Sequence, residues 1–322
     1  MRTRPAVGFT QGEPEVDPLI DLAEITEVEL LILKRMREFT IGEHSSLFHG
    51  TGFDFVGLRD WQAGDRFEAI DWAQSSLTNF SPLIVREFEQ PSTSGVVIVA
   101  DRSASTRCGI VAAGSDTSGL QIATLIARAI ATIGMSAVFF QDSVGLVTFD
   151  EGFRDLRAVR PRIGKGQVIH CLEAYQHGHG LQDLRHTGNL SATLAGFSRK
   201  TSMMPVISDF LFDDAGAFLR ELAQVNNVHD VFVMMVDASF AFDLPRVSAG
   251  WIEVYDVETG HTRMMSRGEL SRQSGRVRAW QDDVSQQAKQ LDLDVIRLGL
   301  DQVKFDVALI EWVGERRLRR RK

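Results

Sequence analysis

The chain has 322 residues, enough for one large domain and a smaller one. Hydrophobic residues make up 44% of it and charged residues 24%, as in an ordinary globular protein. The formal net charge of -8 argues against a protein that binds nucleic acid, although the last seven residues, RRLRRRK, form a basic tail.

Nothing in the sequence predicts export or a membrane anchor. The first residues, MRTRPAVGFTQGEPEVD, are polar and lack the apolar run of a signal peptide. The longest apolar stretch, GLQIATLIARAIATIGMSAVFF, is interrupted by polar residues and indicates a buried helix rather than a transmembrane segment. The two cysteines allow one disulfide bridge at most. We therefore expect a cytoplasmic protein without a transmembrane segment.

The first 94 residues predict a disordered N-terminus followed by a small unit. Residues 1–17 are expected to be disordered, and apolar residues then recur at helical spacing as far as residue 39. Residues 54–90 mix aromatic and charged side chains and end in the strand-like PLIVREFE. Residues 18–94 are therefore expected to combine a helical segment with a small β-rich unit.

Predicted strands and helices alternate from residue 95 to residue 322. The apolar runs VVIVA, SVGLVTF, SMMPVIS and VFVMMV are typical of buried strands, and helical patterns separate them. A hairpin insertion is expected at about 250–266, where Glu258-Thr259-Gly260 is a turn signal. This alternation predicts an α/β fold with a doubly wound, mostly parallel sheet.

Oxygen-bearing side chains follow three of the predicted strands. Asp101, Ser103 and Ser105 come after VVIVA, Ser208 and Asp209 end the SMMPVI strand, and Asp237 follows VFVMMV. Ligands of doubly wound sheets bind at the carboxyl ends of the strands, and Mg²⁺ prefers such oxygen ligands. The alternative is that these residues only form turns and helix caps, for which Asp and Ser are also preferred.

Two stretches resemble known families. The spacing D-x-S-x-S after a strand resembles the metal-ion-dependent adhesion site of von Willebrand factor A domains. The segment GFDFVGLRDWQAGDRFEAIDWAQSSLTNFSPLIVREFE is similar to the signature of the domain-of-unknown-function 58 family, and the resemblance covers about residues 48–322. The matching residues are Phe55, Leu58, Arg59, Gly64, Asp65, Ile70, Asp71, Trp72, Val85, Arg86, Glu87 and Phe88.

The resemblance implies a von Willebrand factor A-like, Rossmann-like domain that acts beside a MoxR-type AAA+ ATPase in the assembly or maturation of client proteins. It also implies a metal site for Mg²⁺ or Mn²⁺ with Asp101, Ser103, Ser105 and Asp209 as ligands. A typical site adds a threonine from a second loop, and the corresponding stretch here is HTGNL, in which Thr187 offers the hydroxyl.

The expected function is therefore that of a non-enzymatic interaction protein with no catalytic residues and no organic cofactor. Two alternatives stay open. The same strand ends are compatible with a metal-dependent hydrolase, or with a scaffold whose metal site is vestigial. Neither a phosphate-binding loop nor a nucleophile elbow surrounds the candidate residues.

Two further clusters have simpler interpretations. The segment HCLEAYQHGHGLQDLRH contains His170, Cys171, His177, His179 and His186, which suit Zn²⁺ chemically but not in spacing, so an exposed loop is favoured. The acidic and basic residues around Asp71 are expected to form an ion-paired network, with catalysis as the alternative.

Overall fold

The computed structural model divides into two compact units: one contains Gly95–Lys322 together with the chain up to Ile32, and the other contains Leu33–Ser94. The helix α1 (Leu22–Ile41) begins in the first unit and continues into the second. The residues that the structure describes are 18–41, 54–62, 70–89, 95–110, 120–150, 156–184, 190–198, 200–242, 251–255, 261–299 and 302–319. The expected disorder of residues 1–17 lies outside them.

The small unit contains the predicted β structure. Strands β1 (Asp54–Asp60) and β2 (Ile84–Glu89) pair antiparallel, and helix α2 (Trp72–Leu77) lies between them in the sequence. Asp71 is the N-cap of α2: its Oδ1 accepts hydrogen bonds from the backbone N–H groups of Ala73 (3.1 Å) and Gln74 (3.2 Å). This side chain, expected in an ion-paired network, therefore caps a helix.

The large unit carries the α/β pattern. Its strands and helices after α1 are, in chain order, β3 (Gly95–Asp101), η2 (Ala104–Arg107), β4 (Gly109–Ile110), β5 (Leu120–Gln121), α3 (Ile122–Phe139), β6 (Ser143–Phe149), β7 (Arg157–Arg162), α4 (Lys165–His177), β8 (Gln182–Asp183), α5 (Leu190–Phe197), β9 (Ser202–Ser208), α6 (Ala215–Asn226), β10 (Asp230–Val236), η4 (Ser239–Phe242), β11 (Trp251–Tyr255), β12 (Thr262–Ser266), α7 (Arg267–Gln290), β13 (Asp294–Leu298) and α8 (Gln302–Arg319). The strands of the expected hairpin, β11 and β12, pair antiparallel.

A seven-stranded sheet forms the centre of this unit, in the order β13-β10-β9-β3-β6-β7-β8. Neighbouring strands from β13 to β6 are parallel, and β7 runs antiparallel to β6 and β8. Strand β3 is apolar at successive positions because both of its faces are buried, as in other parallel sheets covered on both sides. The predicted α/β fold with a mostly parallel sheet is confirmed.

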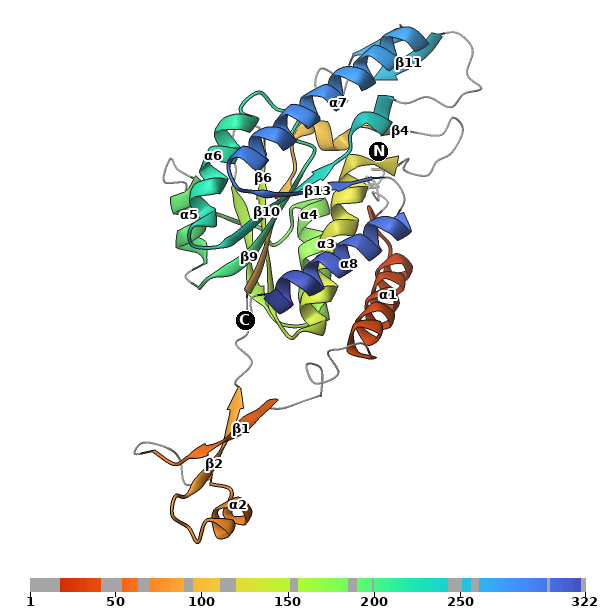
Figure 1. Cartoon of the computed structure of the whole chain (residues 1–322). Helices are drawn as coiled ribbons and strands as arrows, with labels where there is room; N and C mark the ends of the chain where they lie inside the picture. Colours follow the sequence, from red (N-terminus) through yellow and green to blue (C-terminus); the bar gives the residue numbers. More distant parts are fainter. Residues whose placement is uncertain are drawn as a thin grey trace, which may run out of the picture. The chain divides into compact units, whose positions relative to one another are not determined.

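Helices cover both faces of the sheet (Figure 1). On one face, α5, α6 and α7 contribute Leu194, Leu219 and Val284 to a buried apolar cluster with β3, β6, β9 and β10. On the other face, α3 lies between α4 and α8. The sheet is thus the middle of three layers, and its carboxyl-terminal edge is left for a binding site.

Helix α3 is the most deeply buried helix of the described part of the chain. It alone among the described helices is long and apolar enough to cross a membrane, and most of it is buried inside the protein. A side chain at Gly134 would approach Val168 Cγ1 on α4 to 2.8 Å, so a glycine is required where these helices touch. Burial in the protein accounts for the apolar composition that the sequence shows here.

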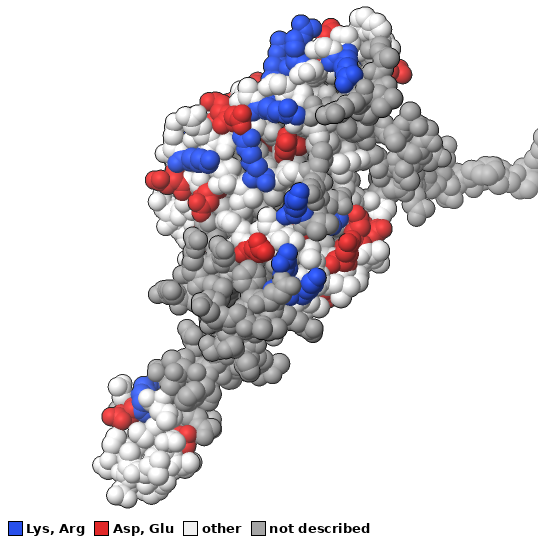
Figure 2. Space-filling model, turned by 45° about the vertical axis from the view of Figure 1, so that its right-hand side comes forward, with Lys and Arg blue, Asp and Glu red and all other residues white. Residues whose placement is uncertain are grey.

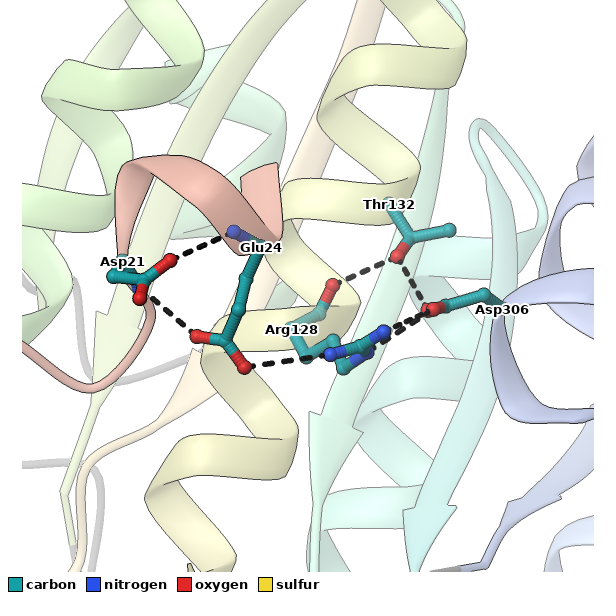
Figure 3. Close-up of polar contacts among 5 residues, drawn as sticks. All are labelled: Asp21, Glu24, Arg128, Thr132 and Asp306. Atoms are coloured by element: carbon teal, nitrogen blue, oxygen red, sulfur yellow. Dashed lines mark hydrogen bonds and ion pairs between the residues drawn. The ribbon is translucent and has the colours of Figure 1, made fainter. Parts of the chain in front are cut away.

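Polar contacts centred on the buried Arg128 join three helices on the second face of the sheet (Figure 3). The Nη2 of Arg128 on α3 lies 2.7 Å from Oδ2 of Asp306 on α8, and both side chains are buried. Thr132 Oγ1 lies 3.0 Å from Oδ1 of the same aspartate, and Glu24 of α1 approaches Arg128 Nη1 at 3.5 Å. The charge of Arg128, which interrupts the apolar pattern of α3, is therefore compensated inside the helical layer.

Candidate functional site

The candidate site lies where β3 and β9 end side by side. These strands are parallel neighbours, so their carboxyl ends meet at one edge of the sheet. Asp101 is the last residue of β3, and Asp209 follows Ser208, the last residue of β9. Ser103 is the N-cap of the short helix η2 that follows β3, and Ser105 lies within its first turn. The topology therefore brings Asp209 to three side chains that precede it by more than 100 residues in the sequence.

Both carboxylate oxygens of Asp101 accept hydrogen bonds. The backbone N–H of Ser103 donates to Oδ1 at 2.7 Å, which fixes the turn after the strand. The hydroxyl of Ser208 donates to Oδ2 and itself accepts the backbone N–H of Phe210 at 2.8 Å. Asp101 is fully buried, so these donors compensate for the water that the carboxylate has lost.

A chain of hydroxyl groups links the two strand ends. Ser105 Oγ donates to Asp209 Oδ1 at 3.2 Å, and Ser103 Oγ lies 3.0 Å from Ser105 Oγ. A hydroxyl has a single proton, and that of Ser105 is used on Asp209, so Ser103 is the donor of the second bond. The Asp209 carboxylate thus receives a hydrogen bond from the loop that follows a different strand.

Asp209 has strongly perturbed electrostatics. Its Oδ1 also accepts the backbone N–H of Leu211 at 3.0 Å, whereas its buried Oδ2 finds no hydrogen-bond partner among the described residues. Burial, followed by repulsion from the charge of Asp101, raises the pKa of Asp209 from 3.8 to about 7. Two buried carboxylates therefore lie close together at this edge of the sheet.

Helix α7 holds the loop that carries Asp209. Gln281 Nε2 donates to the backbone carbonyls of Asp209 (2.9 Å) and Val236 (2.7 Å), and its Oε1 accepts the N–H of Ala238. The indole N–H of Trp280 donates to the carbonyl of Phe210 at 2.7 Å. Two side chains of one helix therefore fix the backbone that follows β9 and the end of the neighbouring strand β10.

Helix α4 supports the β3 end in the same way. The hydroxyl of Tyr175 donates to the backbone carbonyl of Asp101 at 2.9 Å. Burial, together with the charge of Asp101, raises the pKa of Tyr175 well above its usual value, so this phenol stays protonated and acts as a donor. Tyr175 is fixed in the core and has a positioning role.

The structure brings together four of the five residues that the sequence singled out. Asp101, Ser103, Ser105 and Asp209 form one connected cluster. Thr187, the fifth, lies outside the described residues, as does the loop around it. The sequence analysis noted Ser208 at the strand end without giving it a role, and it missed Tyr175 and Gln281. Neither of these two has a local sequence signal that sets it apart from a core residue.

The histidine-rich segment is a helix in its first half, and the loop interpretation of that half is wrong. Helix α4 extends through His177 and ends at Gly178, which has the left-handed backbone conformation that favours glycine. The rings of His177 and His179 stack at 5.8 Å. Cys171 is buried, and burial raises its pKa to about 12, which disfavours the thiolate that zinc binds.

The residues at the sheet edge fit a hard divalent cation. Two carboxylates and two hydroxyls supply only oxygen atoms, the ligand type that Mg²⁺ and Mn²⁺ prefer. The partnerless Oδ2 of Asp209 and the closeness of two buried acids are the features that a cation would compensate. Across the described residues, no group of three or more His, Cys, Asp and Glu side chains is placed to hold a metal ion, so serine hydroxyls would have to complete the set.

Comparison with known proteins places the chain in a family. The sequence profile described as "Protein of unknown function DUF58" matches residues 57–288, which is most of the chain. The protein belongs to this family. No curated protein matches the sequence significantly.

Several solved structures share low similarity with the chain. An aerotolerance-related membrane protein from Bacteroides fragilis is 15% identical, with a TM-score of 0.40, covering 69% of this chain and 99% of its own. BatB from Bacteroides thetaiotaomicron, described as a conserved hypothetical protein, is 14% identical with a TM-score of 0.40, covering 69% and 98%. The pilus adhesin SpaC from Lactobacillus rhamnosus GG is 13% identical with a TM-score of 0.34, covering 71% and 30%.

Proposed function

We propose that the protein is a non-enzymatic interaction module that holds Mg²⁺ or Mn²⁺ at the carboxyl edge of its sheet and uses the ion to bind a partner protein. Asp101, Ser103, Ser105 and Asp209 are the protein's ligands in this proposal. An acidic side chain of the partner completes the coordination of the ion. The loop that contains Thr187 is a further source of a ligand.

The observation that carries the proposal is the state of Asp209. A fully buried carboxylate with one oxygen that has no partner in the described part of the chain, beside a second buried carboxylate, is costly unless a cation is present. Its neighbours are hydroxyl groups, whose lone pairs are available to the same ion. A purely structural turn needs no second buried acid at this place.

The resemblance of the sequence to its family supports a MoxR-type AAA+ ATPase as the partner. In this arrangement the ATPase supplies the energy of ATP hydrolysis, and the present protein connects it to a client protein in a cytoplasmic assembly step. Catalysis is not required of the sheet edge, and the hydroxyl of Tyr175 is engaged as a hydrogen-bond donor to the backbone carbonyl of Asp101.

The metal part of the proposal is tested by calorimetry. Mg²⁺ and Mn²⁺ are titrated into the wild type and into Asp101→Ala and Asp209→Asn variants, with Asp237→Asn as the matched control. Asp237 follows the next strand, β10, and its Oδ1 caps the N–H of Ser239 at 2.9 Å, so it is an aspartate of the same edge outside the cluster. Binding in the wild type and the control only is expected; absence of binding to the wild type at millimolar metal contradicts the proposal.

The partner part is tested by a pull-down with wild-type and Asp101→Ala baits, each in Mg²⁺ and in chelator. The proposal expects an AAA+ ATPase to be recovered with the wild type in Mg²⁺ alone. Equal recovery under all four conditions contradicts a metal-dependent interface. Turnover of a hydrolysable substrate by wild type, abolished in Asp101→Ala, would instead support the hydrolase alternative.

A further inference from the structure

Arg102 is a cation at the candidate edge. It directly follows Asp101, and its backbone N–H donates to the carbonyl of Phe149 at 2.8 Å, which fixes the start of the side chain. Its guanidinium lies beside the end of α4, where a Cβ built on Gly178 would be 3.4 Å from Nη1. Within the part of the chain that the structure describes, the guanidinium makes neither a hydrogen bond nor an ion pair.

A half-buried arginine without a carboxylate is uncommon in a folded protein. Burial lowers the pKa of Arg102, the phenol of Tyr175 opposes this shift, and the charge of Arg157 adds to it. Arg157 belongs to β7 and is paired with Asp183 at 3.1 Å, so its own charge is partly compensated. The five N–H donors of a guanidinium therefore remain available at this place, one residue from Asp101.

We propose that Arg102 is the residue that selects an acidic partner: its guanidinium binds a carboxylate of the partner segment that docks at the Asp101 edge. The inference rests on the proposed function. It adds a side chain of the protein, besides the metal ion, that recognises the acidic group of the partner. A guanidinium holds a carboxylate through two parallel N–H···O bonds, which favours Asp and Glu over neutral residues of the same shape.

The surrounding charges explain why such a residue is needed. The protein has a net charge of -8, and two of its acids, Asp101 and Asp209, lie buried at the site itself. On the face shown in Figure 2, basic and acidic side chains of the described residues are interspersed. At the candidate edge itself, Arg102 is the cation nearest to Asp101 in the sequence, and it offers a local attraction for an acidic group.

A purely structural explanation makes a different prediction. A cation beside the last turn of a helix stabilises that end through the helix dipole, and Arg102 occupies such a position next to Gly178. In that case its replacement lowers the melting temperature and leaves ligand binding unchanged. The experiment therefore measures both quantities.

The test is an NMR titration of the full-length, Mg²⁺-saturated protein with sodium acetate as the probe and acetamide as its uncharged counterpart. The readouts are the Arg102 Nε–H resonance and the backbone amides of Ser103 and Ser105. Wild type is compared with Arg102→Gln, Arg102→Lys and the control Arg107→Gln, an exposed arginine of the same turn. Calorimetry with Mg²⁺ and thermal melts accompany each variant.

We expect acetate, and not acetamide, to shift the Arg102 resonance in the wild type. Acetate affinity should fall roughly tenfold in Arg102→Gln, less in Arg102→Lys and not in Arg107→Gln, because a charge-assisted pair is lost in the first variant only. Equal acetate affinity in wild type and Arg102→Gln overturns the inference, whatever the melts show.

The two proposals fail separately. If the wild type binds Mg²⁺ but acetate does not shift the Arg102 resonance, the metal-dependent function stands and the role proposed for Arg102 is refuted. If Mg²⁺ does not bind but acetate still shifts the Arg102 resonance with the expected loss in Arg102→Gln, the anion subsite stands and the metal part is wrong.

Discussion

The amide of Gln281 donates to the backbone carbonyl of Asp209 across 2.9 Å, linking the middle of helix α7 to the end of strand β9. The same Nε2 donates to the carbonyl of Val236 at the end of β10. One buried side chain therefore ties two neighbouring strand ends to a helix that begins directly after the β11–β12 hairpin. The position of Asp209 depends on a residue 72 positions away in the sequence.

Replacing Gln281 by alanine should loosen this junction. Two buried carbonyls and the N–H of Ala238 lose their partner, which we expect to lower the free energy of unfolding by about 1–3 kcal/mol. Chemical denaturation measures the change, and Mg²⁺ affinity should decrease with it. Gln286→Ala, an exposed glutamine of the same helix, is the control and should change stability by no more than about 0.5 kcal/mol.

The stability of the metal-free protein should depend on the protonation of Asp209. Because its pKa in the folded protein is raised from 3.8 to about 7, the folded state binds a proton that the unfolded state releases between these values. The stabilisation is complete below about pH 4 and is lost as the pH rises through 7. The melting temperature measured in the presence of a chelator should therefore decrease as the pH is raised from 5 to 8.

Asp209→Asn is the matched variant for this pH dependence. An amide does not titrate, so the fall in melting temperature between pH 5 and pH 8 should be smaller than in the wild type. Asp237→Asn, at the end of β10, should retain the wild-type profile. A wild-type melting temperature that rises across this range would show that Asp209 is not the carboxylate with the raised pKa.

The variant Ser208→Ala tests whether Ser208 positions the metal ligands in addition to stabilising the fold. The variant removes the donor to Asp101 Oδ2 and the acceptor of the Phe210 N–H. Loss of such a supporting hydrogen bond is expected to weaken Mg²⁺ binding about tenfold or more. Ser202→Ala, at the opposite end of β9 and also buried, should cost a similar amount of stability without changing metal affinity.

The buried pair of Arg128 and Asp306 should be important for folding when only one member is removed. Asp306→Ala leaves a buried guanidinium with reduced compensation, and we expect a loss of about 3–5 kcal/mol in urea denaturation. The double replacement Arg128→Met with Asp306→Leu should recover most of this loss. Glu24→Gln should cost less than about 1 kcal/mol, since this carboxylate is partly exposed and 3.5 Å away.

The sequence predicted the sheet and the principal residues of the site because both depend on local patterns. Apolar runs that end in Asp101 and Asp209 define strands and their carboxyl ends at once, and parallel pairing then brings the two acids together. The positions of Ser103 and Ser105 follow from the same turn. These features need no information about distant residues.

The remainder depends on contacts that no local pattern records. Tyr175 reaches the carbonyl of Asp101 from 74 residues away, and nothing in its own segment distinguishes it from a core tyrosine. Helix α4 was not predicted from the sequence, because its apolar residues form only a weakly amphipathic pattern and its histidines suggested a loop. The role of Arg102 needed the position of Gly178, which only the folded chain provides.

The order of synthesis gives the packing of α3 a further consequence. This helix emerges early and is as apolar as a membrane span, whereas α8, one of the helices that cover it, follows more than 160 residues later. Until Asp306 leaves the ribosome, Arg128 lacks the counter-charge that lies 178 residues downstream. More than 160 of the 322 residues therefore separate the end of α3 from the start of α8, so during synthesis this strongly apolar helix is complete well before the helix that covers its Arg128 side exists.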